Sequence, residues 1–259
     1  MQPNDPAGTG NPESIRGQIH YLKVIELLQS SLAPGFYLEV GVRNGGSLRF
    51  AKGPAVGIDP AAAITFPLGP ATRLAATTSD DFFAQQGEAL DHPIDLAFID
   101  GMHLFEYALR DFIHIEQHAS PLACVIIDDI FPNHPLQADR DRKTRVWTGD
   151  VWKLRACLEK WRPDLRLIPL DTNPTGLLLI FGLDRENTTL ADHYPAILQE
   201  FSHPEHASPP AGVIERRGAC LPDMALLGSV MRGIRALRHV GSDRKHLFQM
   251  LDLLVPAGT

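Results

Sequence analysis

Apolar residues follow two different patterns in the first part of the chain. Between Glu13 and Leu32 they recur at roughly the helical period and stop before Ala33-Pro34-Gly35, so we expect an amphipathic helix there. Short apolar runs that end at glycine or aspartate are typical of buried strands. Such runs follow the helix at Phe36–Val40, Ala55–Ile58, Arg73–Ala76 and Ile94–Ile99.

The next part of the chain alternates helical patterns with apolar runs, which indicates a parallel sheet. Residues 104–118 and 150–161 have helical spacing, and Ala123–Ile127 is almost continuously apolar. Two further runs, 165–170 and 176–181, are joined by only five residues. So short a link forces antiparallel pairing, because a parallel crossover needs about a dozen residues. We predict an α/β fold with a Rossmann-like, doubly wound, mostly parallel seven-stranded sheet whose last strand is antiparallel.

Beyond Asp184 the pattern weakens. We expect a helix at Tyr194–Phe201, a loop rich in His and Pro at 202–211, and a helix at Met224–Val240 that packs on the sheet or on a second subunit. The chain of 259 residues, 44% of them hydrophobic, fits one main domain better than two equal ones. We therefore divide it into a disordered leader (1–12), a main domain with its N-terminal helix (13–184), and a C-terminal extension (185–259) for substrate or oligomer contacts.

Charge and cysteine content narrow the class of function. A net charge of -7 and a pI near 5.8 disfavour nucleic-acid binding, which relies on clustered Lys and Arg, and favour small-molecule chemistry. Three widely spaced cysteines give neither a zinc-binding pattern nor a disulfide framework. Residues 1–12 lack an apolar stretch and so resemble neither a signal peptide nor a membrane anchor. We expect a cytoplasmic protein, either monomeric or a homo-oligomer.

A glycine-bearing turn follows the first predicted strand, where open α/β sheets bind ligands. Gly41 and Gly45, with Gly46, allow the backbone to pass close to a ligand, and Ser47 is placed to cap the following helix. The spacing is Gly-x-x-x-Gly, which differs from the Gly-x-Gly-x-x-Gly of nicotinamide-binding proteins. Preceded by Glu39, it resembles motif I of methyltransferases. A tight turn without a ligand would look the same.

Asp59 ends the second strand, 18 residues after Gly41. This is close to the spacing of about 20 residues at which a carboxylate meets the hydroxyls of a ribose. An aspartate that merely makes a turn before Pro60 is the alternative. The coincidence with the glycine turn favours ribose binding.

Three carboxylates and one imidazole are expected at the same edge of the sheet. Asp100 ends the fourth strand, and Asp128 and Asp129 end the fifth. Like charges in such a place are tolerated when a cation neutralises them, and oxygen ligands select a hard ion such as Mg²⁺. His103 follows Asp100 by three residues and is our candidate for a general base. Aspartates that only cap helices, with a structural histidine, are the alternative.

A family resemblance rests on three segments: 98–111 (FIDGMHLFEYALRD), 125–129 (VIIDD) and 148–153 (TGDVWK). They resemble the metal-dependent sugar O-methyltransferases of the macrocin and mycinamicin type, over about Phe36 to Phe181. The resemblance implies S-adenosylmethionine as cofactor, with its methionine end over Glu39 and Gly41 and its ribose on Asp59. It also implies Mg²⁺ on Asp100, Asp128 and Asp129, with His103 as the base. The remaining cofactor contacts that it implies are Gly45, Ser47, Thr78, Ser79, Asp80 and Asp100.

The acceptor is expected to be a hydroxyl of a sugar or another small molecule. The polar segment between Phe131 and Gly149 is long enough to act as a lid, with Trp147 or Trp152 as an aromatic wall, although a solvated loop accounts for it equally well. Three rival functions stay open at this point. They are a metal-independent methyltransferase, a nicotinamide oxidoreductase, which the glycine spacing disfavours, and a binding module without catalysis.

Overall fold

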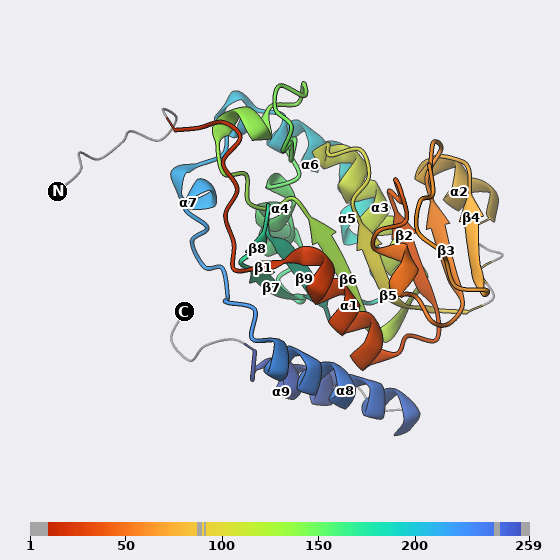
Figure 1. Ribbon diagram of the computed structural model, residues 1–259. Helices are drawn as coiled ribbons and strands as arrows, with labels where there is room; N and C mark the ends of the chain where they lie inside the picture. The colour runs from red at the N-terminus through yellow and green to blue at the C-terminus, as the bar shows by residue number, and fades with distance from the viewer. Residues whose placement is uncertain (1–9, 87–89, 91, 241–243, 255–259) are drawn as a thin grey trace.

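The computed structural model describes residues 10–86, 90, 92–240 and 244–254. Its centre is a seven-stranded sheet in the order β4-β3-β2-β5-β6-β9-β7 (Figure 1). Neighbouring strands are parallel from β4 to β6, whereas β9 is antiparallel to both β6 and β7. The predicted fold and the antiparallel last strand are therefore confirmed. The strands are β2 (Tyr37–Val40), β3 (Ala55–Ile58), β4 (Thr72–Ala75), β5 (Ile94–Ile99), β6 (Ala119–Asp128), β7 (Arg166–Leu170) and β9 (Leu177–Phe181).

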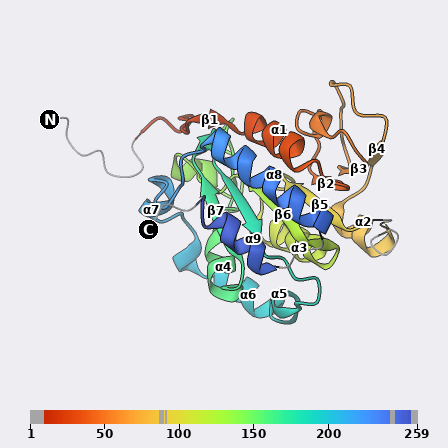
Figure 2. The same cartoon turned by 90° about the horizontal axis from the view of Figure 1, so that it is seen from below.

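Helices cover both faces of the sheet and bury two separate cores (Figure 2). On one face, α3 (Phe105–Gln117) and α4 (Lys153–Trp161) bury residues such as Phe112 and Leu158. On the other face, α1 (Tyr21–Leu32) and α8 (Met224–Val240) bury residues such as Leu28 and Met231. Because strand side chains alternate between the faces, the uninterrupted apolar run of β9 supplies both cores at once.

The N-terminal helix is shorter than the sequence predicts. It was expected to begin at Glu13, but α1 begins at Tyr21, and β1 (Ile19–His20) pairs in parallel with β8 (Thr172–Asn173). Gly17 has φ +111°, and a Cβ on it would lie 2.3 Å from the backbone carbon of Thr172. The apolar spacing before residue 21 therefore belongs to an extended segment, because glycine permits a backbone that no helix adopts and that lies directly on β8.

The C-terminal part packs against the main domain. The helices expected at Tyr194–Phe201 (α6) and Met224–Val240 (α8) are confirmed. Of the two partners considered for α8, the structure supplies the protein's own sheet, since α8 contacts both α1 and β6. The remaining elements are η1 (Leu48–Phe50), α2 (Ser79–Gln86), η3 (Pro135–Ala138), α5 (Thr189–Asp192), η4 (Pro204–His206), α7 (Ala211–Ile214) and α9 (Arg244–Leu251).

Most of the leader expected at 1–12 lies outside the described residues. Across the described part of the chain, none of the helices combines the length and apolar character needed to cross a bilayer.

Candidate functional site

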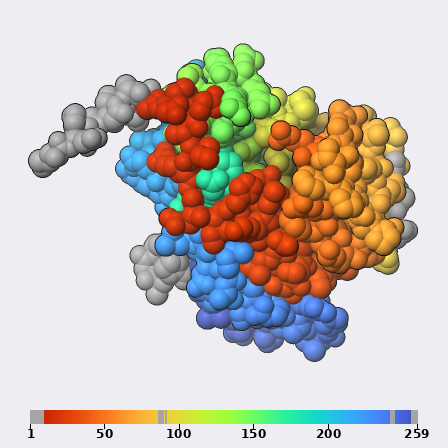
Figure 3. Space-filling view, viewed as in Figure 1, coloured from red at the N-terminus to blue at the C-terminus, as the bar shows by residue number. Residues whose placement is uncertain are grey.

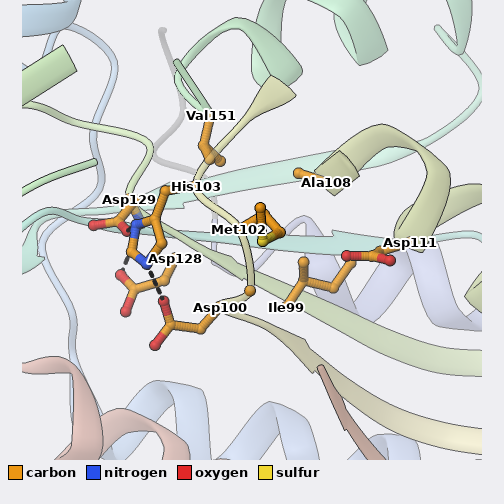
Figure 4. Close-up of a pocket in the computed structure, with 10 residues that line it drawn as sticks. Ile99, Asp100, Met102, His103, Ala108, Asp111, Asp128, Asp129 and Val151 are labelled. Atoms are coloured by element: carbon orange, nitrogen blue, oxygen red, sulfur yellow. Dashed lines mark hydrogen bonds and ion pairs between the residues drawn. The ribbon is translucent and has the colours of Figure 1, made fainter. Parts of the chain in front are cut away.

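The acidic cluster lies where the parallel strands β5 and β6 end, as the sequence predicts. Asp100, His103 and Asp129 each offer one ligand atom, and these three atoms lie within 4.8 Å of one another (Figure 4). His103 Nδ1 is 2.5 Å from an oxygen of Asp129, and its Nε2 is 3.7 Å from an oxygen of Asp100. Asp100 and His103 are each 25% exposed, so the cluster is reachable from solvent.

Asp128 belongs to the same pocket but has a different environment. One oxygen of its carboxylate accepts hydrogen bonds from the backbone N–H of Asp129 (2.8 Å) and from the Thr175 hydroxyl (3.4 Å). Among the described residues, the ligand atoms of Asp100, His103 and Asp129 converge. The predicted set was Asp100, Asp128 and Asp129, so His103 takes the place of Asp128 in it.

The protonation of the cluster follows from burial and crowding. The pKa of Asp100 is raised to about 7, mainly by burial, while His103 lowers it and the neighbouring Asp129 raises it. Burial also raises the pKa of Asp128 well above its usual range, with added repulsion from Asp129 and Asp100. Burial lowers the pKa of His103, but the carboxylates of Asp129 and Asp100 outweigh it and bring the value to about 9. The carboxylates thus favour a positive charge in their midst.

The backbone is also unusual here. His103 and Asp129 have φ values of 56° and 66°, in the left-handed region that residues other than glycine rarely adopt. Such conformations cost about 1–3 kcal/mol each and persist where the surrounding structure imposes them, often at functional sites. The loop that precedes α4 contributes to this constraint, because a Cβ on Gly149 would lie 1.7 Å from the His103 carbonyl oxygen.

The glycine turn lies beside the cluster, although its glycines serve the protein's own packing. Gly41 has φ +86°, and a Cβ there would lie 2.0 Å from the Asp100 carbonyl oxygen. Gly45 has φ +81°, and a Cβ there would lie 3.2 Å from the Leu68 side chain and 3.4 Å from the Ile64 side chain. The absence of a Cβ at Gly41 therefore lets the turn approach Asp100 and places both on one edge of the sheet.

The prediction that Ser47 caps a helix is wrong. The segment after the turn forms only the 3-10 helix η1, and Ser47 makes no side-chain capping bond. Its hydroxyl instead donates to Glu39 (2.7 Å), whose other oxygen accepts from the Tyr37 hydroxyl (2.6 Å). Glu39 is fully buried, and burial raises its pKa to about 8 despite these two hydrogen bonds. Tyr37 and Ser47 thus fix a buried carboxyl group beneath the turn.

Asp59 ties the glycine turn to the end of β3. One oxygen of its carboxylate accepts the backbone N–H of Arg43, and the other accepts the N–H of Ala61, both at 2.7 Å. The turn-making role is therefore part of what Asp59 does. Each carboxylate oxygen has a second lone pair, so ribose binding is compatible with these contacts.

Residues near the start of α2 have partners within the protein. Thr78 exchanges hydrogen bonds with Asp81 and so caps α2. Asp80 binds the Arg110 guanidinium through both oxygens, at 2.9 and 2.7 Å, and the hydrogen bonds from Arg110 lower its pKa. Ser79 hydrogen-bonds to the buried Asp111. The structure thus places these three residues together at the end of β4.

Two aromatic residues complete the surroundings of the cluster. Trp147, from the loop between Phe131 and Gly149, stacks on the His103 ring at a centroid distance of 5.0 Å, whereas Trp152 is buried. Of the two candidates for an aromatic wall, Trp147 is the one at the cluster. Tyr21 was not predicted as part of the site, yet burial, followed by the charges of Asp128 and Asp100, raises its pKa above its usual range. Its place in a predicted helix gave no signal of that neighbourhood.

Comparison with known proteins gives a family match over part of the chain and a similar fold. Residues 38–130 match the family described as a methyltransferase domain. No curated protein matches the chain. Cofactor-bound Rv0187 from MTB is 17% identical with a TM-score of 0.50, over 64% of this chain and 80% of that one. This similarity concerns the fold.

Two further solved structures have lower scores. The O-methyltransferase TomG from Streptomyces achromogenes, involved in tomaymycin synthesis and solved with SAM, is 16% identical with a TM-score of 0.49, over 63% of this chain and 80% of that one. The MycE methyltransferase of the mycinamycin biosynthetic pathway, solved with Mg and SAH, is 16% identical with a TM-score of 0.42, over 59% of this chain and 46% of that one.

Proposed function

We propose that this chain is a class I S-adenosylmethionine-dependent methyltransferase, which the match of residues 38–130 to a methyltransferase domain supports, and that it methylates a hydroxyl oxygen of a small-molecule acceptor with the help of a divalent cation. The observation that carries the proposal is the convergence of Asp100, His103 and Asp129 beside the glycine turn. The turn provides the edge where a cofactor binds in open α/β sheets. The cluster lies next to that edge and provides groups that could hold an acceptor hydroxyl and accept its proton, as an O-methylation requires.

The side chains present fit a hard divalent cation. Two carboxylates and one imidazole come within the span of a single ion, and burial, with added repulsion from Asp129, raises the pKa of Asp100. Oxygen-rich sets of this kind favour Mg²⁺ or Mn²⁺ over zinc. Asp100 and Asp129 would hold the ion, with Asp128 beside them. When bound, such a cation supplies Lewis acidity that lowers the pKa of the acceptor hydroxyl.

The cofactor is assigned to the glycine turn. Asp59 would accept the ribose hydroxyls, and Gly41 with Gly45 would border the methionine end, above the buried Glu39 that Ser47 holds. At the far end, Ser79 and Asp80 would border the adenine. This arrangement would direct the reactive methyl group toward Asp100, the member of the metal cluster whose backbone lies against Gly41.

His103 would take the acceptor proton when a cation neutralises Asp100 and Asp129, because without a cation these carboxylates raise the pKa of the imidazole to about 9 and keep it protonated at neutral pH. Its ring lies between Asp100 and Asp129, which orient the imidazole and stabilise the imidazolium that results. The hydroxyl oxygen then attacks the methyl carbon in line with the departing sulfur, so that the protein's contribution is mainly orientation and deprotonation. Trp147 covers the outer face of the ring and would border an acceptor such as a sugar or a phenol.

A metal-independent methyltransferase is the second candidate, and one observation favours it. The direct contact of His103 with Asp129 allows the protonated imidazole itself to neutralise the carboxylates. In that case the cluster needs no ion.

A transfer assay with and without chelator tests the proposal. S-adenosylmethionine with a labelled methyl group is incubated with the protein and hydroxyl compounds, with methyl glucosides and catechol as first probes. We expect transfer that excess EDTA abolishes and Mg²⁺ restores. Full transfer in EDTA would establish the metal-independent candidate instead, and a lack of transfer to any hydroxyl compound would contradict O-methylation.

A further inference from the structure

The N-terminal segment formed by residues 11–16 lies along the loop formed by residues 131–149 (Figure 3). Gln137 joins the two. Its Nε2 donates to the carbonyl oxygens of Pro12 and Ser14, both at 2.8 Å, and its Oε1 accepts the backbone N–H of Asn133 at 2.8 Å. Because Gln137 is fully buried and its amide is satisfied on both sides, residues 12–14 are fixed against the loop.

Glu13 lies between those two contact points and reaches further along the loop. Its carboxylate accepts the backbone N–H of Arg145 at 3.0 and 3.1 Å, and that of Val146 at 3.3 Å. A carboxylate that receives successive N–H groups acts as an anionic cap, and such charge-assisted bonds are stronger than neutral ones. Glu13 therefore fixes the backbone immediately before Trp147.

The end of the loop fits closely against His103. The indole of Trp147 stacks on the imidazole with an angle of 21° between the ring planes, and its Nε1 donates to the Asp139 carbonyl oxygen at 2.7 Å. Backbone N–H groups of Thr148 and Gly149 both donate to the Gln137 carbonyl oxygen. A displacement of residues 145–149 would thus move the ring that covers His103.

We propose that Glu13 is a positioning residue of the acceptor side of the site, and that it acts by holding Trp147 over His103. This rests on the proposed function, since the acceptor side is defined by the methyl transfer. Glu13 itself contacts neither the cluster nor the glycine turn. Within the described part of the chain, the Glu13 carboxylate acts on the site through the backbone N–H groups of Arg145 and Val146.

The test compares Glu13→Ala, Glu13→Gln and the matched control Glu26→Ala, whose carboxylate is on the exposed side of α1. Amide hydrogen exchange is measured at residues 145–149. The quenching of Trp147 fluorescence by acrylamide is measured as the difference between each protein and the same protein with Trp147→Phe, which isolates Trp147 from the other tryptophans. We expect Glu13→Ala to speed exchange at Arg145 and Val146 about tenfold, as for a lost charge-assisted hydrogen bond, and to increase quenching. Glu13→Gln keeps an acceptor oxygen and should lie in between.

Kinetics then separate positioning from simple support of the fold. With the methyl glucoside or catechol probe that is methylated, Glu13→Ala should raise KM for the probe about tenfold and leave the Kd for S-adenosylhomocysteine unchanged. Unchanged exchange and quenching, equal changes in Glu26→Ala, or an unchanged KM despite faster exchange would each overturn the role of Glu13. If no probe is methylated, the proposed function fails, and exchange with quenching still decides whether Glu13 holds Trp147.

Discussion

His103 is the residue on which the proposed chemistry depends most. It has a carboxylate on either side, an indole on one ring face and a left-handed backbone. Each of these features restricts the orientation of the imidazole ring more than is usual for a histidine on the surface. The arrangement is consistent with a group that must present one nitrogen in a defined direction.

Replacing His103 should therefore affect turnover and not cofactor binding. For His103→Asn we expect kcat to fall by roughly 10² to 10⁴, the usual loss when a general base is removed, with an unchanged Kd for S-adenosylhomocysteine by calorimetry. His239→Asn is the matched control, because His239 is exposed near the opposite edge of the sheet. Equal turnover in the two variants would remove His103 from catalysis.

Asp59 should contribute to cofactor binding through the proposed contact with the ribose. Asp59→Asn keeps one acceptor oxygen but loses the charge that two backbone N–H groups contact and that the ribose would share. We expect the Kd for S-adenosylmethionine to rise roughly 10- to 100-fold, in line with the loss of charge-assisted hydrogen bonds. Calorimetry with 5′-methylthioadenosine, which retains the ribose, should show a comparable loss. A loss confined to S-adenosylmethionine would place Asp59 at the methionine end instead.

Asp111 gives a prediction about stability that is independent of catalysis. It is 3% exposed, and among the described residues its Oδ1 is one of the buried oxygens without a hydrogen-bond partner. Burial, opposed by the hydrogen bond from Ser79, raises its pKa to about 7. Since the ordinary value is near 3.8, the folded protein holds a proton that the unfolded chain has lost between these two pH values.

Stability should therefore fall as the pH rises through that interval. Asp111→Asn cannot ionise, so its stability relative to the wild type should improve by up to roughly 4 kcal/mol between about pH 4 and pH 8. Urea unfolding of both proteins across this range measures the difference. A difference that stays constant with pH would mean that Asp111 is already ionised in the folded state.

At the level of elements, the sheet is the part that the sequence predicts best. Strands buried on both faces must be apolar, so continuous apolar runs stand out at residues 96–99 of β5, 122–127 of β6 and 177–181 of β9. The extended N-terminal segment was misassigned because apolar spacing alone does not report that Gly17 lies against Thr172. β1 and β8, of two residues each, are too short to leave a periodic signal.

Part of the site was also predicted from the strands. Residues that follow a strand directly, such as Asp100 and Asp129, are placed by the sheet itself. The partners of side chains are not, because they depend on how distant segments pack. The Ser47–Glu39 hydrogen bond, the approach of Tyr21 and the Glu13 contacts with the loop join residues whose relation is visible only in three dimensions.

At the scale of the whole molecule, the C-terminal extension is part of the fold. Met231 on α8 is fully buried in the core that includes α1 and one face of the sheet. The interaction of α8 with the sheet therefore accounts for its apolar face without a second subunit. A role for other parts of residues 185–259 in substrate or oligomer contacts stays a prediction.

Met231→Ala should accordingly behave as a core mutation. We expect the free energy of unfolding to fall by about 2–5 kcal/mol, the range for truncating a large buried side chain, with an unchanged Kd for S-adenosylhomocysteine at a temperature where the variant is folded. Chemical denaturation and calorimetry give the two values. A loss below about 0.5 kcal/mol, as for a surface substitution, would mean that α8 is not packed on the main domain in solution.

The central claim, that the carboxylates at the ends of β5 and β6 hold a divalent cation, can be tested without knowledge of the acceptor. Titration with Mn²⁺, followed by its paramagnetic resonance signal, measures the number of bound ions and their Kd. The account predicts one Mn²⁺ per chain in the wild type, displaced by Mg²⁺, and binding weakened at least roughly tenfold in Asp100→Asn, as expected when a charged ligand is lost. Absence of Mn²⁺ binding in the wild type, or equal binding in Asp100→Asn, would contradict it.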